Sequence, residues 1–196
     1  MAHDREEKIG AILHAAIRVL AEKGYNDATI PEISAAANVS RGILHYYFKD
    51  KEDLVCRALA SSTSRLVQSS LEGLKGKSVE EIAENVVYIH KRNLSEHADF
   101  YGFLFEMWCI SRRSKRIRKA FTNCQEKVLN AIKGWLENAS DQGIIKINLS
   151  QSEAIAELLM AITDGTAFEF IDHPEKIDDK KVSVLLRKII LSVLKQ

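Results

Sequence analysis

The chain has 196 residues, of which 46% are hydrophobic, and its formal net charge is only +1. This composition provides enough apolar surface for a sizeable core and excludes an intrinsically disordered chain. A net charge near zero gives no sign of nucleic-acid binding, because many DNA-binding proteins are strongly basic. Neither a secretory signal nor an apolar stretch of about 18 residues is present, and the three cysteines are scattered. We therefore expect a soluble cytoplasmic protein without disulfides.

Few helix-breaking residues interrupt the sequence, since only two prolines and nine glycines occur in it. Apolar residues recur at three- and four-residue spacing over long stretches, which predicts an all-α fold of about nine helices. The first helix is expected over about residues 4–23, with Gly24 ending it. Thr29 and Glu32 have the spacing of a capping box, which predicts a short second helix ending near Ala37.

A three-residue turn follows, and Ser40 can cap a short third helix over residues 41–48. Five apolar residues are expected to form the small core that fixes the angle between these helices: Ile33, Ala37, Val39, Ile43 and Leu44. Two short capped helices joined by a tight turn are typical of a helix-turn-helix. The second helix of that motif meets base edges in the major groove of DNA.

Six longer helices are expected in the remainder of the chain. Ser78 with Glu81 and Ser150 with Glu153 have capping-box spacing, whereas residues 145–149 alternate like a strand but lack a partner strand, so we expect a loop there. The expected helices lie at about 51–74, from Ser78 through Ile89, at about 97–110, from Ile117 through Trp135 to before Gly143, at about 150–172, and from about 178 to the end, the last one after Pro174. No flexible linker appears, so we expect a DNA-binding domain over 1–51 and a ligand-binding and dimerisation domain over 52–196, joined by the shared fourth helix.

The segment 29–51, TIPEISAAANVSRGILHYYFKDK, resembles the TetR family of bacterial and archaeal repressors. The residues that carry the resemblance are Thr29, Ile30, Ile33, Ala37, Val39, Ser40, Leu44, Tyr46, Tyr47, Phe48, Lys51, Leu54 and Val55. They cover about the first quarter of the chain, and the rest agrees only in its helical layout. The resemblance implies a ligand-responsive repressor that binds a palindromic operator as a dimer and is released by a small-molecule effector.

The resemblance also implies which residues contact DNA. The expected partners are phosphate for Thr29 and Lys51, bases for Arg41, Gly42 and His45, and phosphate or thymine methyl groups for Tyr46 and Tyr47, with Ser40 at the helix cap. Arginine can bond guanine through two hydrogen bonds, and glycine lets the backbone approach closely. Residues 1–51 contain seven basic and seven acidic residues, however, so non-specific affinity for DNA is expected to be weak. A helical hairpin that binds protein is the alternative.

Residues 100–108 form the densest aromatic cluster and include a single charged residue, Glu106. An apolar region with few polar groups is typical of a small-ligand site, although such residues are more often core. The TetR resemblance implies a pocket for a largely apolar effector in the C-terminal domain. The predicted lining is Tyr101, Leu104, Phe105, Trp108, Asp164 and Phe168. Asp164 and Glu169 either are solvated at the edge of their helix or select a cationic ligand.

The last two helices are apolar on every side, which is more surface than one subunit of this size is expected to bury. Two such helices from each of two subunits make a four-helix interface, whereas a single thick core is the alternative. The predicted interface residues are Leu158, Ile162, Leu186, Ile189 and Val193.

A basic run without acidic residues is made by Arg112, Arg113, Lys115, Arg116, Arg118 and Lys119. Such a run is usually a solvated face, and the alternative is a site for an anion such as the phosphates of an acyl-CoA. His90 and His97 lack a third ligand, so neither a metal nor a cofactor is expected. The sequence has no G-x-S-x-G, phosphate loop or H-E-x-x-H motif, so an enzyme and a helical adaptor without DNA binding are only alternatives.

Overall fold

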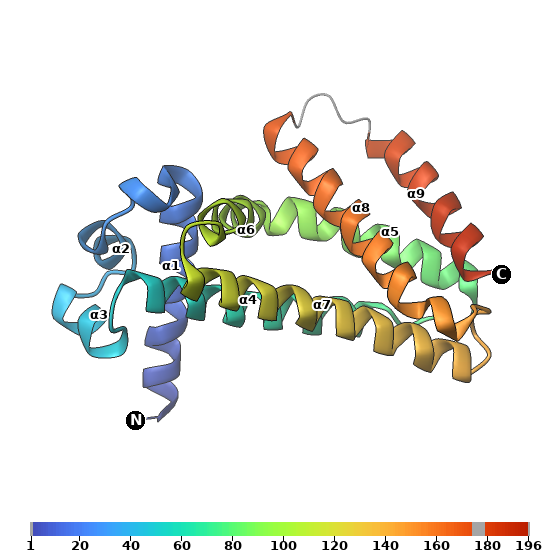
Figure 1. The fold of residues 1–196 in the computed structure, drawn as a ribbon, viewed down its shortest axis with the longest axis horizontal. Helices are drawn as coiled ribbons and strands as arrows, with labels where there is room; N and C mark the ends of the chain where they lie inside the picture. The colour runs from blue at the N-terminus through green and yellow to red at the C-terminus, as the bar shows by residue number, and fades with distance from the viewer. Residues whose placement is uncertain (1, 174–178, 196) are drawn as a thin grey trace. The chain divides into compact units, whose positions relative to one another are not determined.

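The computed structural model describes residues 2–173 and 179–195, which form nine α-helices and one 3-10 helix (Figure 1). In chain order these are α1 (Ala2–Asp27), α2 (Ile30–Ala36), α3 (Arg41–Tyr47), α4 (Lys51–Gly73), α5 (Val79–Glu96), α6 (Ala98–Ser111), α7 (Lys115–Asp141), η1 (Leu149–Gln151), α8 (Ser152–Asp172) and α9 (Asp179–Leu194). The predicted all-α fold is confirmed. Within the described ranges, no helix is both long and apolar enough to cross a bilayer. Pro174 lies outside the described residues.

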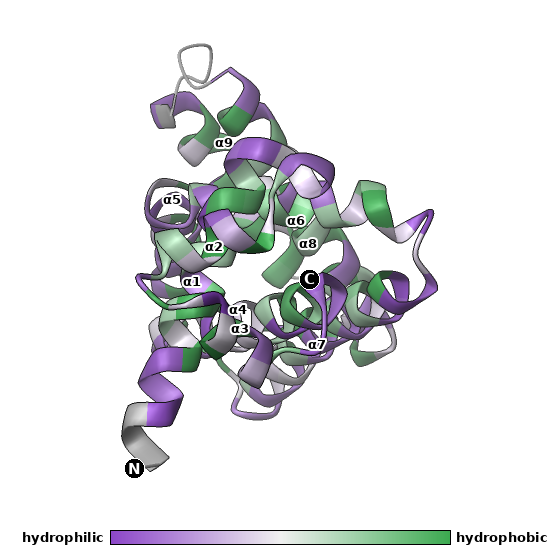
Figure 2. Ribbon diagram, turned by 90° about the vertical axis from the view of Figure 1, so that its left-hand side faces the viewer, coloured by the Kyte–Doolittle hydropathy of each residue, from purple (hydrophilic) through white to green (hydrophobic). Residues whose placement is uncertain are grey.

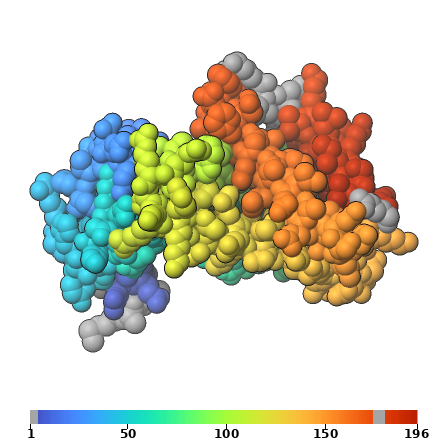
Figure 3. All heavy atoms as spheres, in the orientation of Figure 1, coloured from blue at the N-terminus to red at the C-terminus, as the bar shows by residue number. Residues whose placement is uncertain are grey.

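The chain forms two compact units. Unit 1 contains the chain up to Thr63 together with Asp99–Cys124, and unit 2 contains Ser64–Ala98 and the chain from Gln125 onward. In Figure 3 the yellow-green atoms of the α6–α7 region lie against the blue and cyan atoms of the N-terminal helices, all within unit 1. Unit 1 therefore extends beyond residues 1–51. We propose that residues 1–51 are the part of it that binds DNA.

The core of unit 1 uses the apolar stripe of α1. Ile12 and Leu20 are fully buried, as are Ile33 on α2 and Leu44 on α3, while the first turns of α1 are hydrophilic (Figure 2). The predicted helix-turn-helix core is partly wrong. Ile43 is 37% exposed, and Ala37 and Val39 are only half-buried. Of the five predicted core residues, Ile33 and Leu44 are the ones that anchor these helices, and α2 packs against both α1 and α3.

Of the three predicted capping boxes, two mark helix starts that the structure contains. The backbone N–H of Thr29 donates to Glu32 Oε2 at 2.9 Å, and Ser78 Oγ accepts from the Glu81 N–H at 3.2 Å. The capping box predicted at Ser150 is wrong. The Asn148 side chain accepts the Ser150 N–H at 3.1 Å, which starts the 3-10 helix, and α8 begins only at Ser152.

Residues 145–149 form no strand. Apart from the 3-10 helix that starts at Leu149, this stretch is irregular, and its one β-bridge joins Lys146 to Lys195. Gly24, which was predicted to end the first helix, has a φ of 76° and breaks α1 with a kink, beyond which a short helical stretch continues to Asp27.

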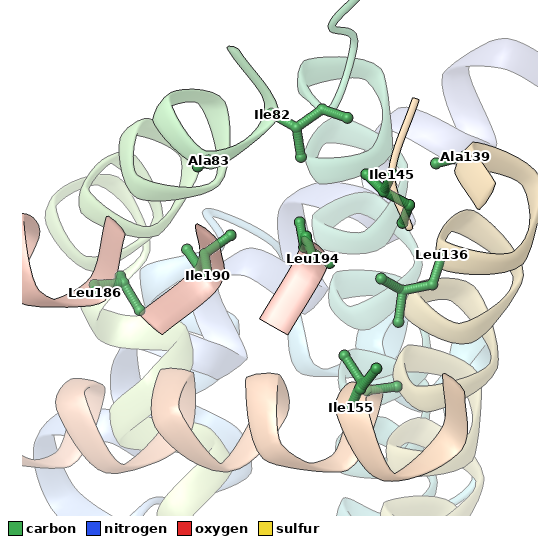
Figure 4. Packing of buried hydrophobic residues seen from close by; sticks show 10 residues of the cluster. Ile82, Ala83, Leu136, Ala139, Ile145, Ile155, Leu186, Ile190 and Leu194 are labelled. Carbon is green, nitrogen blue, oxygen red and sulfur yellow. The ribbon is translucent and has the colours of Figure 1, made fainter. Parts of the chain in front are cut away.

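The core of unit 2 is built by α5, α7, α8 and α9 together with Ile145, which lies in the segment after α7 (Figure 4). Its buried members are Ile82, Ala83, Leu136, Ala139, Ile145, Ile155, Ala156, Leu186, Ile190 and Leu194. Leu186 is only 6% exposed, so its assignment to an exposed interface is wrong, because it packs inside its own subunit. Ile162 and Val193 are partly buried against the same core. Leu158 and Ile189, in contrast, are 60% and 45% exposed.

Candidate functional site

Helix α3 presents a polar and aromatic face to solvent. Its first turn is capped by Ser40, whose Oγ accepts the Ile43 N–H at 3.3 Å, and Leu44 anchors its inner side. Four of the residues predicted to read or touch DNA are exposed there: Arg41, Gly42, His45 and Tyr46. Tyr46 is 78% exposed, far more than a tyrosine with a packing role would be. This face has the size and chemistry of a helix that enters the major groove.

Aromatic and cationic contacts fix the C-terminal end of α3. The rings of Tyr46 and Tyr47 meet edge to face at 5.0 Å between centroids, and the Arg5 guanidinium lies 5.8 Å from the centroid of the Tyr47 ring. Arg57 donates to the Tyr47 carbonyl at 2.8 Å and lies 4.3 Å from the centroid of the Phe48 ring. These contacts hold the two tyrosines in place before any ligand binds.

Lys51 has an internal role that the sequence did not indicate. Its ammonium donates to the carbonyl oxygens of Tyr25 and Ala28 and lies 4.4 Å from the centroid of the Tyr25 ring. Burial lowers the pKa of this lysine. A lysine has three N–H donors, so two are used within the protein and one remains for a phosphate. Lys51 thereby ties the start of α4 to the last turn of α1 and to Ala28, which follows it.

A second contact holds the same segment from α6. The Glu106 carboxylate accepts the backbone N–H of Tyr25 at 2.5 Å. A Cβ atom at Gly24 would lie 3.2 Å from Glu106 Oε1, and Gly24 has a φ of 76°, so this turn needs glycine both for its backbone and for the approach of Glu106. In the sequence, the only indication of this contact was that Glu106 is a charged residue inside an apolar helix.

Glu32 connects the predicted phosphate-contacting residue Thr29 to α1. Glu32 Oε1 accepts from Lys23 Nζ at 2.5 Å, and Glu32 Oε2 accepts from the Thr29 hydroxyl at 2.8 Å. These hydrogen bonds, that from Lys23 first, lower the pKa of Glu32 to about 2. Thr29 stays exposed at the N-terminus of α2, where the helix dipole favours a negative group.

The α3–α4 corner is joined to the start of α7. Arg116 donates to both carboxylate oxygens of Asp50 at 2.9 Å and to Asp53 at 3.1 Å. The backbone N–H of Asp53 and then Arg116 hold the pKa of Asp50 below its usual value. The end of the helix-turn-helix is therefore braced by a helix that lies more than 60 residues further along the chain.

The six residues predicted to line an effector pocket are divided between the two units. Tyr101 is buried, whereas Leu104 and Phe105 are half-buried, all in unit 1. Trp108 in unit 1 and Phe168 in unit 2 are 52% and 54% exposed, so neither is enclosed within its own unit. A hollow of about 620 Å³ exists in unit 2, but it is lined by residues such as Lys75, Trp135 and Ile144 and by none of the six.

Asp164 is half-buried in unit 2, and burial raises its pKa to about 6. Within the described part of the chain it has no hydrogen bond or ion pair. Nearby in sequence, the Thr166 hydroxyl lies 2.9 Å from His90 Nε2. Among the residues that the structure describes, no group of three or more His, Cys, Asp or Glu side chains is placed to hold a metal ion.

Comparison with known proteins agrees with this geometry. Residues 12–58 match the family model described as bacterial regulatory proteins, tetR family. The fatty acid metabolism regulator protein of Bacillus subtilis is 23% identical over 189 residues, which cover 96% of each chain. Relatives found in this way are named as transcriptional regulators rather than enzymes.

Two solved structures illustrate the shared fold. The transcriptional regulator FadR from Bacillus subtilis, in complex with stearoyl-CoA, has a TM-score of 0.75 and 22% identity, and the match covers 93% of this chain and 97% of that one. A TetR transcription regulator from Haloarcula marismortui has a TM-score of 0.77 and 20% identity, with coverage of 97% and 100%. The capped α2 and the exposed α3 both lie within residues 12–58, so the segment that matches the tetR family model is the one that presents the candidate DNA-reading face.

Proposed function

We propose that this chain is a ligand-responsive repressor that binds a palindromic operator as a homodimer and leaves it when a small-molecule, largely apolar effector binds. The observation that carries the proposal is the exposed reading face of α3, with Arg41, Gly42, His45 and Tyr46 held outward by a buried Leu44. Two recognition helices related by a two-fold axis would read half-sites about one DNA turn, roughly 34–36 Å, apart.

The DNA-binding part is tested with an operator selected from a random duplex library. Arg41→Ala and His45→Ala should each weaken operator binding by about 1–3 kcal/mol and relax base preference at one position, because each removes a hydrogen bond to a base edge. Lys180→Ala, an exposed lysine in unit 2, is the matched control and should bind like the parent chain. Failure to select any sequence, or selection unaffected by both variants, would refute the proposal.

Dimerisation is proposed through the outer faces of α8 and α9. Large apolar side chains remain exposed there: Leu158, Phe168, Ile171, Val184, Leu185 and Ile189. Between Leu158 and Phe168, the same side of α8 carries only the small residues Ala161 and Gly165, which let a second helix approach closely. A symmetric contact that covers this surface would complete a four-helix bundle.

The effector is proposed to act through α6. This helix carries Tyr101, Leu104, Phe105 and Trp108, which we propose line the effector site. The same helix carries Glu106, whose hydrogen bond to the Tyr25 N–H reaches the segment just before α2. An effector that favours one position of α6 would thereby favour one position of the reading helices. FadR of Bacillus subtilis was solved with stearoyl-CoA, so that molecule is the first effector to test.

The coupling is tested by titrating stearoyl-CoA into the protein–operator complex of the parent and of Glu106→Ala. In the parent, effector and operator should weaken each other by the same factor, typically about 5–150-fold. Glu106→Ala should still bind stearoyl-CoA and the operator, but the factor by which each weakens the other should fall towards one. Glu106→Gln should restore the factor, because glutamine keeps an oxygen that can accept the Tyr25 N–H. Glu126→Ala, which removes an exposed carboxylate from α7, is the control. Parent-like coupling in Glu106→Ala would refute this route.

A further inference from the structure

The basic run at the α6–α7 turn lies outside the reading face of α3, so the proposed base contacts do not account for it. Two of its six members have internal partners. Arg116 binds Asp50 and Asp53, and Arg118 donates to the carbonyl oxygens of Ser111 and Arg112 at 2.9 and 3.1 Å. The other four, Arg112, Arg113, Lys115 and Lys119, are exposed and make no ion pair within the described part of the chain. These four residues are called the basic turn below.

The basic turn supplies the positive charge of unit 1. Residues 1–63 contain eight basic and nine acidic residues, whereas residues 99–124 contain six basic and two acidic ones. The helix-turn-helix and its supporting helices are therefore slightly acidic by themselves. Affinity for the DNA backbone comes from lysines and arginines that neutralise phosphates, so a DNA-binding unit without excess positive charge lacks the main source of that affinity.

The basic turn also lies beside the DNA-reading elements. Arg116, in the middle of the run, is hydrogen-bonded to Asp50 and Asp53 at the α3–α4 corner, and Figure 3 shows this yellow-green region against the cyan residues of that corner. No acidic residue occurs between Glu106 and Glu126 to cancel the charge. Cations in the first turn of α7 are unfavourable for the helix itself, so its own stability does not account for them.

We propose that the basic turn is a second DNA-binding surface, which binds backbone phosphates that flank the bases read by α3. It reads no sequence, and it supplies the electrostatic affinity that the helix-turn-helix lacks. This inference depends on the proposed DNA binding but concerns residues outside the predicted DNA-binding segment.

The test compares two quadruple variants that lower the net charge equally. The first is Arg112→Gln, Arg113→Gln, Lys115→Gln and Lys119→Gln, and the matched control is Lys75→Gln, Lys77→Gln, Lys146→Gln and Lys180→Gln, all exposed in unit 2. Binding to a labelled random-sequence duplex is measured by fluorescence anisotropy against salt concentration. Melting temperatures check that both variants are folded.

The first variant should lower the slope of log K against log salt by about 0.9 for each phosphate that it no longer binds. If each protomer of a dimer binds two phosphates fewer, the slope should fall by about 3.6, while the control variant should keep the parent slope. Arg112→Lys with Arg113→Lys should also keep it, because lysine binds phosphate as a point charge. On the selected operator, the weaker binding should appear with long flanks and disappear when the flanks are trimmed.

Equal slopes for the first variant and the parent would overturn the inference, as would an equal reduction in the control variant, which would indicate a general effect of net charge. Unchanged DNA binding together with abolished binding of stearoyl-CoA would also overturn it and would assign the turn to an anionic ligand. If the parent itself binds no duplex at any salt concentration, the proposed function fails as well, so the two failures are distinguishable.

Discussion

Gly165 offers a sharp test of the proposed dimer because it lies in the middle of the exposed apolar side of α8. A Cβ atom built there meets no other atom within 4 Å, so a larger side chain causes no clash inside the subunit. Gly165→Leu should stabilise an isolated subunit by about 0.8 kcal/mol, because glycine is the poorest helix former after proline. That gain corresponds to a rise of about 2–3 °C in melting temperature for a chain of this size.

The dimer should respond in the opposite way. Insertion of extra methylene groups into a packed interface costs about 1–3 kcal/mol, and two-fold symmetry applies this cost twice. A total of roughly 2–6 kcal/mol would weaken dimerisation by about 30-fold to 20,000-fold. Sedimentation velocity over nanomolar to micromolar concentrations measures the shift. Operator affinity should fall in parallel, because a monomer has only one recognition helix.

Gly134→Leu is the matched control for this experiment. Gly134 is also exposed within a helix of unit 2, and a Cβ atom there likewise meets nothing within 4 Å. This variant should gain the same helix stability and keep the parent dimer. The reasoning is refuted if Gly165→Leu dimerises like Gly134→Leu, since the outer side of α8 would then be outside any interface.

Two further predictions concern stability. The folded-state pKa of Asp164 is raised from 3.8 to about 6, so this carboxyl destabilises the folded chain progressively as pH rises through that window and fully above it. Asp164→Asn should therefore raise the free energy of unfolding by up to about 3 kcal/mol near pH 7.5 and by little near pH 3.5. Urea unfolding at the two pH values measures this difference. A gain of equal size at both pH values would contradict the burial argument. Thr29→Ala removes the cap of α2 and should cost about 0.5–2 kcal/mol in the same assay, while an unchanged urea midpoint would show that Glu32 and Lys23 hold this helix without the cap.

Local patterns in the sequence were sufficient for most of the fold. The Thr29–Glu32 and Ser78–Glu81 boxes predicted two helix starts because donor and acceptor lie three residues apart, and such hydrogen bonds depend on little else. The same reasoning failed at Ser150, because Asn148 lies two residues earlier and its side chain captures the Ser150 N–H first. A capping motif is therefore a competition among neighbouring polar side chains, and its spacing alone does not decide the outcome.

The hydrogen bonds that brace the candidate site could not be predicted from such local patterns. Glu106 and Tyr25 are 81 residues apart, and Arg116 and Asp50 are 66 apart, so only the folded chain brings them together. The family resemblance predicted which residues of α3 contact DNA, and for Lys51 it predicted only a contact with phosphate. Its hydrogen bonds to the Tyr25 and Ala28 carbonyls add a structural one.

The apolar helices show why the sequence could not choose which residues are left exposed for the proposed dimer. Successive residues of a helix point about 100° apart, so an amphipathic pattern identifies the buried face, but α9 has apolar residues at 184, 185, 186, 189 and 190. Leu186 and Ile190 are one turn apart and face the core formed with α5, whereas Leu185 and Ile189 are rotated away from it and remain 58% and 45% exposed. The apolar residues of α9 extend beyond its buried face, so their spacing alone does not choose between these pairs. The choice is made by the neighbouring helices, and it leaves Leu185 rather than Leu186 available to a second subunit.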